Sequence, residues 1–311
     1  MARVRGLLWF LGLFAAGFAA MGLLTYPLWV ALSAHFDLAF HRVGSRLGML
    51  VLLVGFILVA RRLGLADRAS LGYGLARPRF LREAAIGFAF GVALMALVVG
   101  LMAALGLREL KPWVEWRFGL LAPILFGGIL SGLAVALIEE TFFRGAMHTA
   151  VARDSGPVLA IASTALIYSA VHFLGRYRIA AEDAHAGSGI ELLAGSFANF
   201  AQPLVIADAF LCLAAVGVLL GLVRHVTGNI AACIGLHAGW VTVIALTRKL
   251  SQPVRDQPLS FLLSDFDGMV GWLVLGWTAL TGVFLVSYYR RRASTPGGAT
   301  AAPPSGSRTA R

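Results

Sequence analysis

Long apolar runs separated by short polar loops constrain the fold of this chain more than any other feature. Most of the runs approach the ~20 residues that an α-helix needs to cross the hydrocarbon core of a bilayer. A transmembrane barrel would instead show short segments of alternating polarity. We therefore predict an all-α fold, a polytopic transmembrane helix bundle of about eight helices. The runs cover roughly residues 7–32, 47–60, 84–106, 120–150, 157–175, 203–223, 229–247 and 269–289.

The composition supports a lipid bilayer as the surroundings of this chain. Of 311 residues, 59% are hydrophobic and 13% are charged, and the mean hydropathy is +0.82. A soluble domain carries about twice that share of charged residues, because charge covers its surface. The two cysteines, Cys212 and Cys233, both lie in apolar runs and form no CxxC motif. The sequence therefore predicts neither a disulfide framework nor a structural zinc site.

The net charge of +11 would suggest a nucleic-acid partner in a soluble protein. Here most basic residues lie between apolar runs, where such charge sets the orientation in the membrane. With a cytosolic N-terminus, 16 of the 26 basic residues fall on the cytosolic side and 10 on the other. We predict that both termini are cytosolic and that there is no nucleic-acid partner. The short loops and the Ala, Gly and Arg bias indicate a multi-pass protein of a bacterial inner membrane.

The pattern divides the chain into four parts. Residues 1–118 hold about three N-terminal helices, and 119–250 form a central segment that carries the polar motifs described below. Residues 251–293 form the last loop and the last helix, and the Pro-, Gly- and Ser-rich tail 294–311 is expected to be disordered. Within the loop 176–202, the apolar stretch 190–198 predicts a short helix at the membrane surface.

Ionisable residues inside apolar runs are costly, so they are candidate functional residues. The first group is Glu139-Glu140-Thr-Phe-Phe-Arg144. On a helix Glu140 and Arg144 are four residues apart and can pair, whereas Glu139 points about 100° away. We expect a supporting ion pair at Glu140 and a carboxylate at Glu139 that is free for general-base chemistry.

Two histidines complete the set of candidates. Tyr168 and His172 share a helix face in the fifth run, and His237 lies among small residues in the seventh run. Small residues let helices approach closely, so His237 is expected to face the bundle interior. Taken alone, each histidine is more typical of a packed, hydrogen-bonded core residue than of a catalytic one.

Taken together, the Glu-Glu-x-x-x-Arg, Tyr-x-x-x-His and later His motifs resemble the CPBP family (CAAX protease and bacteriocin-processing, also called Abi) over roughly 120–247. The resemblance implies an intramembrane endopeptidase that cleaves a protein or peptide substrate near the cytosolic side, from a cavity open to the cytosol. It implies that Glu139 and His172 activate the attacking water and that His237 stabilises the oxyanion. Glu140 and Arg144 would then be the supporting pair.

One position departs from the family pattern. The family usually has Asn four residues after the last histidine, as a second oxyanion donor, and this chain has Val241. Losing such a donor can lower the rate ~10²–10³-fold. Trp240 and Thr242 are the candidate replacements.

Three alternatives stay open. Glu139, His172 and His237 could together hold a catalytic zinc ion, although we favour a mechanism with no cofactor. The change at Val241 also fits a non-catalytic membrane scaffold or immunity protein. A proton-coupled transporter would use the same Glu and His residues with Asp208, but no matching polar set is found elsewhere in the chain. The HExxH and GxSxG motifs of other proteases are absent.

Overall fold

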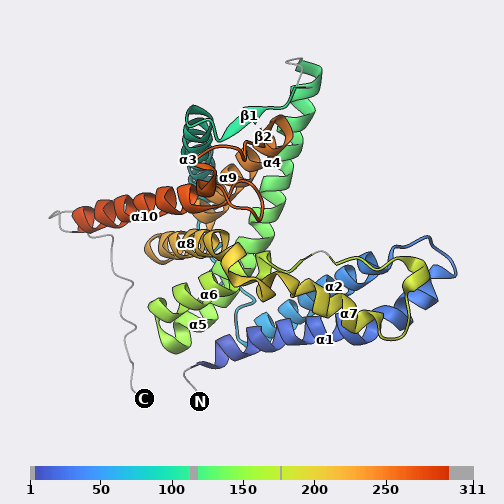
Figure 1. The fold of residues 1–311 in the computed structure, drawn as a ribbon. Coiled ribbons are helices and arrows are strands. Elements are labelled where there is room, and N and C mark those ends of the chain that lie inside the picture. Colours follow the sequence, from blue (N-terminus) through green and yellow to red (C-terminus); the bar gives the residue numbers. More distant parts are fainter. Residues whose placement is uncertain (1–3, 113–117, 176, 294–311) are drawn as a thin grey trace, which may run out of the picture.

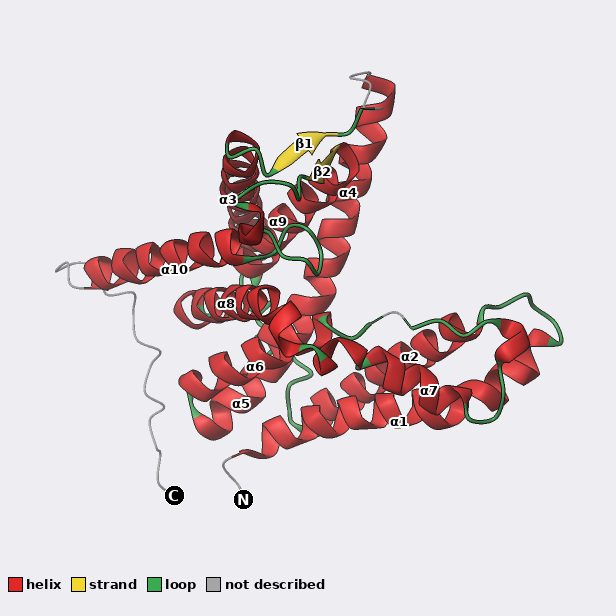
Figure 2. Ribbon diagram, in the orientation of Figure 1, coloured by secondary structure: helices red, strands yellow, loops and turns green. Residues whose placement is uncertain are grey.

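The computed structural model describes residues 4–112, 118–175 and 177–293, and they form a helical bundle (Figures 1 and 2). The disordered tail predicted for 294–311 lies outside the described residues. Among the described residues, the short elements between the helices are two strands, three 3₁₀ turns (Ala181–Asp183, Ala198–Ala201 and Ser260–Leu262) and a π-helical turn, Thr141–Met147. The helices are α1 (Arg5–Ser33), α2 (Phe40–Arg62), α3 (Arg77–Ala104), α4 (Phe118–Glu140), α5 (His148–Ser155), α6 (Pro157–His172), α7 (Ser188–Ser196), α8 (Pro203–Thr227), α9 (Ala231–Leu250) and α10 (Trp272–Ala293).

The prediction of an all-α membrane bundle is confirmed. Within the described residues, six helical segments are long and apolar enough to cross a membrane, by length and composition: α1, α2, α3, the continuous segment Leu121–Ser155, α8 and α9. Helix α6 and residues Trp272–Ser287 of α10 are apolar but shorter. Large apolar side chains such as Leu24, Leu53 and Leu204 are exposed on the helix surfaces, as expected where lipid surrounds them. The number of crossings and the side of the termini stay predictions.

Every predicted apolar run contains a helix, although the bounds differ. The run 47–60 extends at both ends into α2, and the run 120–150 is divided by the π-helical turn into α4 and α5. A tight hairpin then joins α5 to α6. Gly156 adopts φ +83° there, which strains any residue with a Cβ, and Pro157 begins the next helix at a position that suits its fixed φ.

Helix α9 lies at the centre of the part of the chain that carries the polar motifs. It packs against α3 on one side and α4 on the other, while α6 packs against α8 and α8 against α10 (Figure 1). The close approach of α3 and α9 depends on glycines. A Cβ at Gly235 would overlap the Ala84 carbonyl, and one at Gly91 would overlap the Leu236 carbonyl. Small residues therefore bring these backbones together, as is common in membranes.

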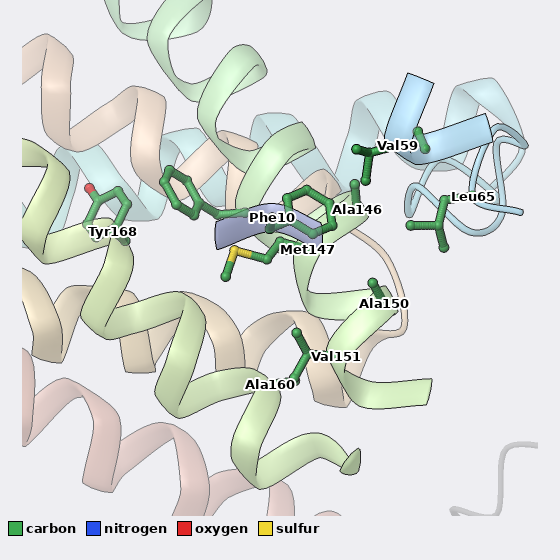
Figure 3. Close-up of a cluster of buried hydrophobic side chains, with 11 residues drawn as sticks. Phe10, Val59, Leu65, Ala146, Met147, Ala150, Val151, Ala160 and Tyr168 are labelled. Carbon is green, nitrogen blue, oxygen red and sulfur yellow. The ribbon is translucent and has the colours of Figure 1, made fainter. Parts of the chain in front are cut away.

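The remaining helices form a second group, in which α1 packs against α2 and α7 (Figure 1). A cluster of buried side chains joins this group to the π-helical turn (Figure 3). Phe10 of α1 is fully buried beside Met147 and lies edge-on to Phe142, with ring centroids 5.4 Å apart. The N-terminal helix thus supports the turn that carries the acidic motif.

A two-stranded ribbon, which the sequence did not predict, lies beyond the end of α9. Strands β1 (Arg108–Leu110) and β2 (Ser251–Pro253) pair antiparallel, with Arg108 opposite Pro253. The buried Arg108 guanidinium donates to the carbonyls of Gly268 (2.8 Å) and Ser251 (3.1 Å). It thereby fixes the loop between α9 and α10 over the bundle.

Candidate active site

The acidic motif places a buried ion pair in the middle of the bundle. Nη1 of Arg144 lies 3.1 Å from Oε1 of Glu140, and both side chains are 0% exposed. The guanidinium also lies over the Tyr168 ring, 4.5 Å from its centroid, and donates to the Gly217 carbonyl at 3.3 Å. The Glu140–Arg144 pair expected from helix spacing is therefore present, and α6 and α8 enclose it.

Hydrogen bonds from side chains of other elements hold the π-helical turn that follows Glu140. Thr141 donates its hydroxyl to the Leu137 carbonyl (2.6 Å), so the Tyr73 hydroxyl, also at 2.6 Å, donates to Thr141. Burial raises the pKa of Tyr73, and the hydroxyl keeps the proton that this bond requires. On the next turn, Nε of Arg224 donates to the Arg144 carbonyl at 3.0 Å. Single π turns within helices are often found at functional sites.

His237 lies between the two glutamates. Its Nδ1 donates to Oε1 of Glu140 at 2.8 Å, and its Nε2 lies 3.9 Å from Oε2 of Glu139. The Glu139 side chain is 27% exposed, in contrast to the fully enclosed Glu140. Glu140 therefore orients the histidine through one nitrogen, while Glu139 faces the other. The sequence predicted a partner for Glu140 in Arg144 and missed the second one in His237.

His172 is oriented by its own helix. Nδ1 donates to the Tyr168 carbonyl at 2.7 Å, so Nε2 of the neutral ring carries the lone pair. The Tyr168 ring lies beside both histidines, with centroids 4.5 Å from that of His172 and 6.2 Å from that of His237. Both histidines line one cavity.

This cavity has a volume of about 590 Å³, which is typical of sites that enclose a ligand. Its walls come from α3, α4, α6, α8, α9 and α10 and are mostly apolar. From the histidines it extends along α9 to Arg248, whose side chain is 51% exposed and pairs with Asp267 at 2.6 Å. The arrangement can hold an extended apolar segment against the two histidines, and Glu139 lies behind one of them, 3.9 Å from Nε2 of His237.

The comparison with known families matches this part of the chain. Residues 120–243 match the family model described as type II CAAX prenyl endopeptidase Rce1-like. This segment therefore resembles the Rce1-like family. The resemblance expected from the three motifs is thereby confirmed, and Glu139, His172 and His237 all lie within the match. No curated protein and no solved structure matches the chain.

Within the Rce1-like segment, the positions proposed to replace the missing asparagine differ in their surroundings. Val241 and Trp240 line the cavity. Thr242 faces α4 instead, where its hydroxyl lies 2.7 Å from the Ala238 carbonyl and 3.4 Å from the Gly128 carbonyl. Trp277 of α10, which the sequence did not single out, also lines the cavity, and its buried Nε1 has no partner among the described residues. A tryptophan in the last apolar run gave no signal, because only the fold brings α10 to the site.

The direction of the cavity bears on the predicted cytosolic termini and on the cytosolic opening that the family resemblance implies. Its outer end meets the segments that follow α6 and α9, at Gly175 and Asp267. The loop 63–76 lies at the opposite end, where it contacts α5 through a hydrogen bond from Arg153 to Ser70 (2.7 Å). If the Arg-rich loop 61–83 is cytosolic, this end of the cavity faces the other side of the membrane. The predicted cytosolic termini and cytosolic opening both stay predictions.

The candidate zinc ligands form no compact set. In the described ranges, no group of three or more His, Cys, Asp and Glu side chains is arranged to hold a metal ion. Asp208, the acid considered for a proton pathway, is buried at the start of α8 and accepts a hydrogen bond from Ser264 at 3.1 Å. It therefore contributes to holding the loop between α9 and α10.

Proposed function

We propose that the chain is an intramembrane endopeptidase that hydrolyses a peptide bond of a protein or peptide substrate with water activated by Glu139 and His172. The observation that carries the proposal is the position of His237, between Glu140 and Glu139 on the cavity of an Rce1-like segment. An ion pair with a merely structural role would not need a histidine that faces a second, partly exposed carboxylate.

The roles follow from the hydrogen bonds. The Glu139 carboxylate accepts one proton of the attacking water, and the lone pair on Nε2 of His172 accepts a hydrogen bond from the remaining O–H. The water oxygen adds to the scissile carbonyl carbon. The carbonyl oxygen becomes an oxyanion, and a doubly protonated His237 stabilises it through Nε2–H. The proton taken from water then passes to the leaving amine as the C–N bond breaks. Glu140 and Arg144 hold His237 in place.

This mechanism uses no cofactor. If Glu139, His172 and His237 instead hold zinc, the metal would supply the activated water. The two versions differ in a direct measurement. We expect cleavage by the purified protein to persist after dialysis against a chelator, and loss of cleavage that added zinc restores would refute the cofactor-free mechanism.

The side from which substrate reaches the site follows from the cavity and the charge pattern together. We propose a multi-pass protein of a bacterial inner membrane whose loop 61–83 is cytosolic, with a substrate that approaches from the extracytoplasmic side near Arg248. Single cysteines at Asp267 and Asp67, introduced into a Cys212→Ser/Cys233→Ser background, test it. A membrane-impermeant maleimide added to intact spheroplasts should label the cysteine at 267 and leave the one at 67 unlabelled; the opposite pattern would refute this orientation.

The catalytic roles are tested by comparing the membrane peptidomes of cells that carry the wild type or a single variant. Glu139→Gln, His172→Ala and His237→Ala should each abolish the same cleavage products while the protein accumulates normally in the membrane. Glu182→Gln changes an exposed acid of the loop between α6 and α7 and is the matched control. Wild-type products from Glu139→Gln would exclude the proposed mechanism.

Val241 favours one second candidate, a non-catalytic scaffold, because a residue that cannot donate a hydrogen bond lines the cavity. A scaffold would give identical peptidomes for the wild type and all three variants. It would still lose its partner when the cavity is filled, for example by Val241→Trp. The two candidates therefore differ in which substitution has an effect.

A further inference from the structure

A second cavity lies outside the catalytic machinery. It has a volume of about 420 Å³ and is formed by α1, α2, α7 and the segment that follows His172. In Figure 1, α7 lies beside α1 and α2 at the place where these helices group together. The cavity therefore brings together residues that are more than a hundred positions apart in the sequence.

The polar side of this cavity is basic and uncompensated. His41, Arg42 and Arg178 line it, with the Ser45 hydroxyl, and no carboxylate does. None of the ion pairs found in the described part of the chain includes Arg42 or Arg178. Glu191 of α7 pairs with His185 instead, at 3.0 Å.

These basic residues lie where positive charge is unfavourable. Arg42 lies beside His41 in the first turn of α2, whose N-terminus carries partial positive charge of its own. A second guanidinium, that of Arg178, comes to the same cavity from another segment and adds to the repulsion. An anion relieves this repulsion, and the forked guanidinium groups fit the geometry of phosphate oxygens.

The other side of the cavity is apolar and continues along a helix that can span the membrane. Met21, Met49 and Leu192 line it, and the Met49 side chain is 59% exposed on α2. A ligand that satisfies both sides has an anionic head and an apolar tail. Free phosphate or an acidic peptide would leave the apolar half without a partner, whereas an acyl chain would cover it.

We propose that this cavity binds an anionic glycerophospholipid, with the phosphate held by Arg42, Arg178 and His41 and an acyl chain along Met49 of α2. Basic recesses between transmembrane helices are favourable places for such headgroups. Gly175 lines both this cavity and the active-site cavity, three residues after His172. The bound lipid would thus form part of the surface beside the opening through which substrate reaches the histidines.

The test measures lipid retention and does not depend on peptidase activity. The purified protein is placed in nanodiscs of phosphatidylcholine with a minor share of phosphatidylglycerol, and the retained lipid is identified by native mass spectrometry. We expect selective retention of phosphatidylglycerol. Arg42→Gln or Arg178→Gln each removes one arginine contact to the headgroup and should reduce retention about 5-fold, and the double variant should reduce it about 30-fold. Arg46→Gln is the matched control, because Arg46 lies one turn further along α2, is exposed and does not line the cavity.

Three other outcomes would overturn the proposal. Equal retention by the double variant and by Arg46→Gln would show that general surface charge attracts the lipid. Displacement of phosphatidylglycerol by inorganic phosphate at equal concentration would show that the head alone is recognised. Binding of a polyglutamate peptide in place of the lipid would make the site a peptide site. An inactive protein that still retains the lipid would count against the proposed function and not against this site.

Discussion

The buried pair of Glu140 and Arg144 allows the sharpest test of how this membrane core is held together. Arg144→Met keeps much of the volume of the side chain and removes its charge. The Glu140 carboxylate then keeps one partner, His237, in a place that is 0% exposed. Breaking a buried ion pair by removing one partner costs about 3–5 kcal/mol of unfolding free energy. The lost contact with the Tyr168 ring, 4.5 Å away, is part of that cost.

The double variant makes the prediction specific. Glu140→Gln alone leaves the Arg144 guanidinium buried without a charge partner, although the amide oxygen of Gln can still accept from His237. Combined with Arg144→Met, it leaves no unpaired charge at the pair. We expect each single variant to lose about 3–5 kcal/mol and the double variant no more than the worse single one, which gives a coupling energy of at least about 3 kcal/mol.

The measurement is a double-mutant cycle of reversible unfolding in mixed micelles, followed by tryptophan fluorescence. The matched control is the surface pair Arg79–Glu83, which has the same spacing and a distance of 3.2 Å but side chains that are 73% and 27% exposed. Its coupling energy should be about 0.3–0.5 kcal/mol. If the cycle at Glu140 and Arg144 gives a value as small as that of the control, the argument from burial is wrong.

Three further predictions follow from single positions. Val241→Asn, which restores the family's second oxyanion donor to the cavity wall, should raise kcat about 10–100-fold in a peptide-cleavage assay; an unchanged kcat would mean that another group already fills the role. Gly235→Val should destabilise the protein by more than about 2 kcal/mol, measured by unfolding in micelles, because its side chain would overlap the Ala84 carbonyl between α3 and α9. Gly156→Ala should cost about 1–3 kcal/mol in the same assay, since φ is +83° there and nothing crowds the position; no loss would show that the hairpin relaxes.

The helices could be predicted from the sequence because membrane burial requires about 20 apolar residues in a row, and that length is visible without any tertiary information. The predictions are wrong or incomplete where something other than the length of an apolar run determines the structure. Helix α2 begins at Phe40, before the apolar run at 47, because polar residues such as Arg42 and Ser45 can occupy a helix end near the membrane surface. Strands β1 and β2 are each only three residues long, which is too short to show an alternating pattern in the sequence.

The site was predictable only as far as local geometry reaches. The spacing of Glu140 and Arg144 on a helix is enough to pair them, and the structure shows that pair at 3.1 Å. The contact of Glu140 with His237 spans 97 positions and depends on how closely α9 approaches α4, which no local pattern encodes. The same holds for Trp277, which reaches the cavity only because α10 packs on α8.

The two adjacent glutamates differ in role because the charges around them must balance inside a membrane. Glu140 has Arg144 on one side and His237 on the other, both buried with it. Arg144 compensates one of the two carboxylates, which leaves one negative charge in the group. Nδ1 of His237 is held by the buried Glu140, and its Nε2 faces the partly exposed Glu139 at 3.9 Å. The contacts that balance charge around Glu140 therefore also hold His237 in the position that its proposed role requires.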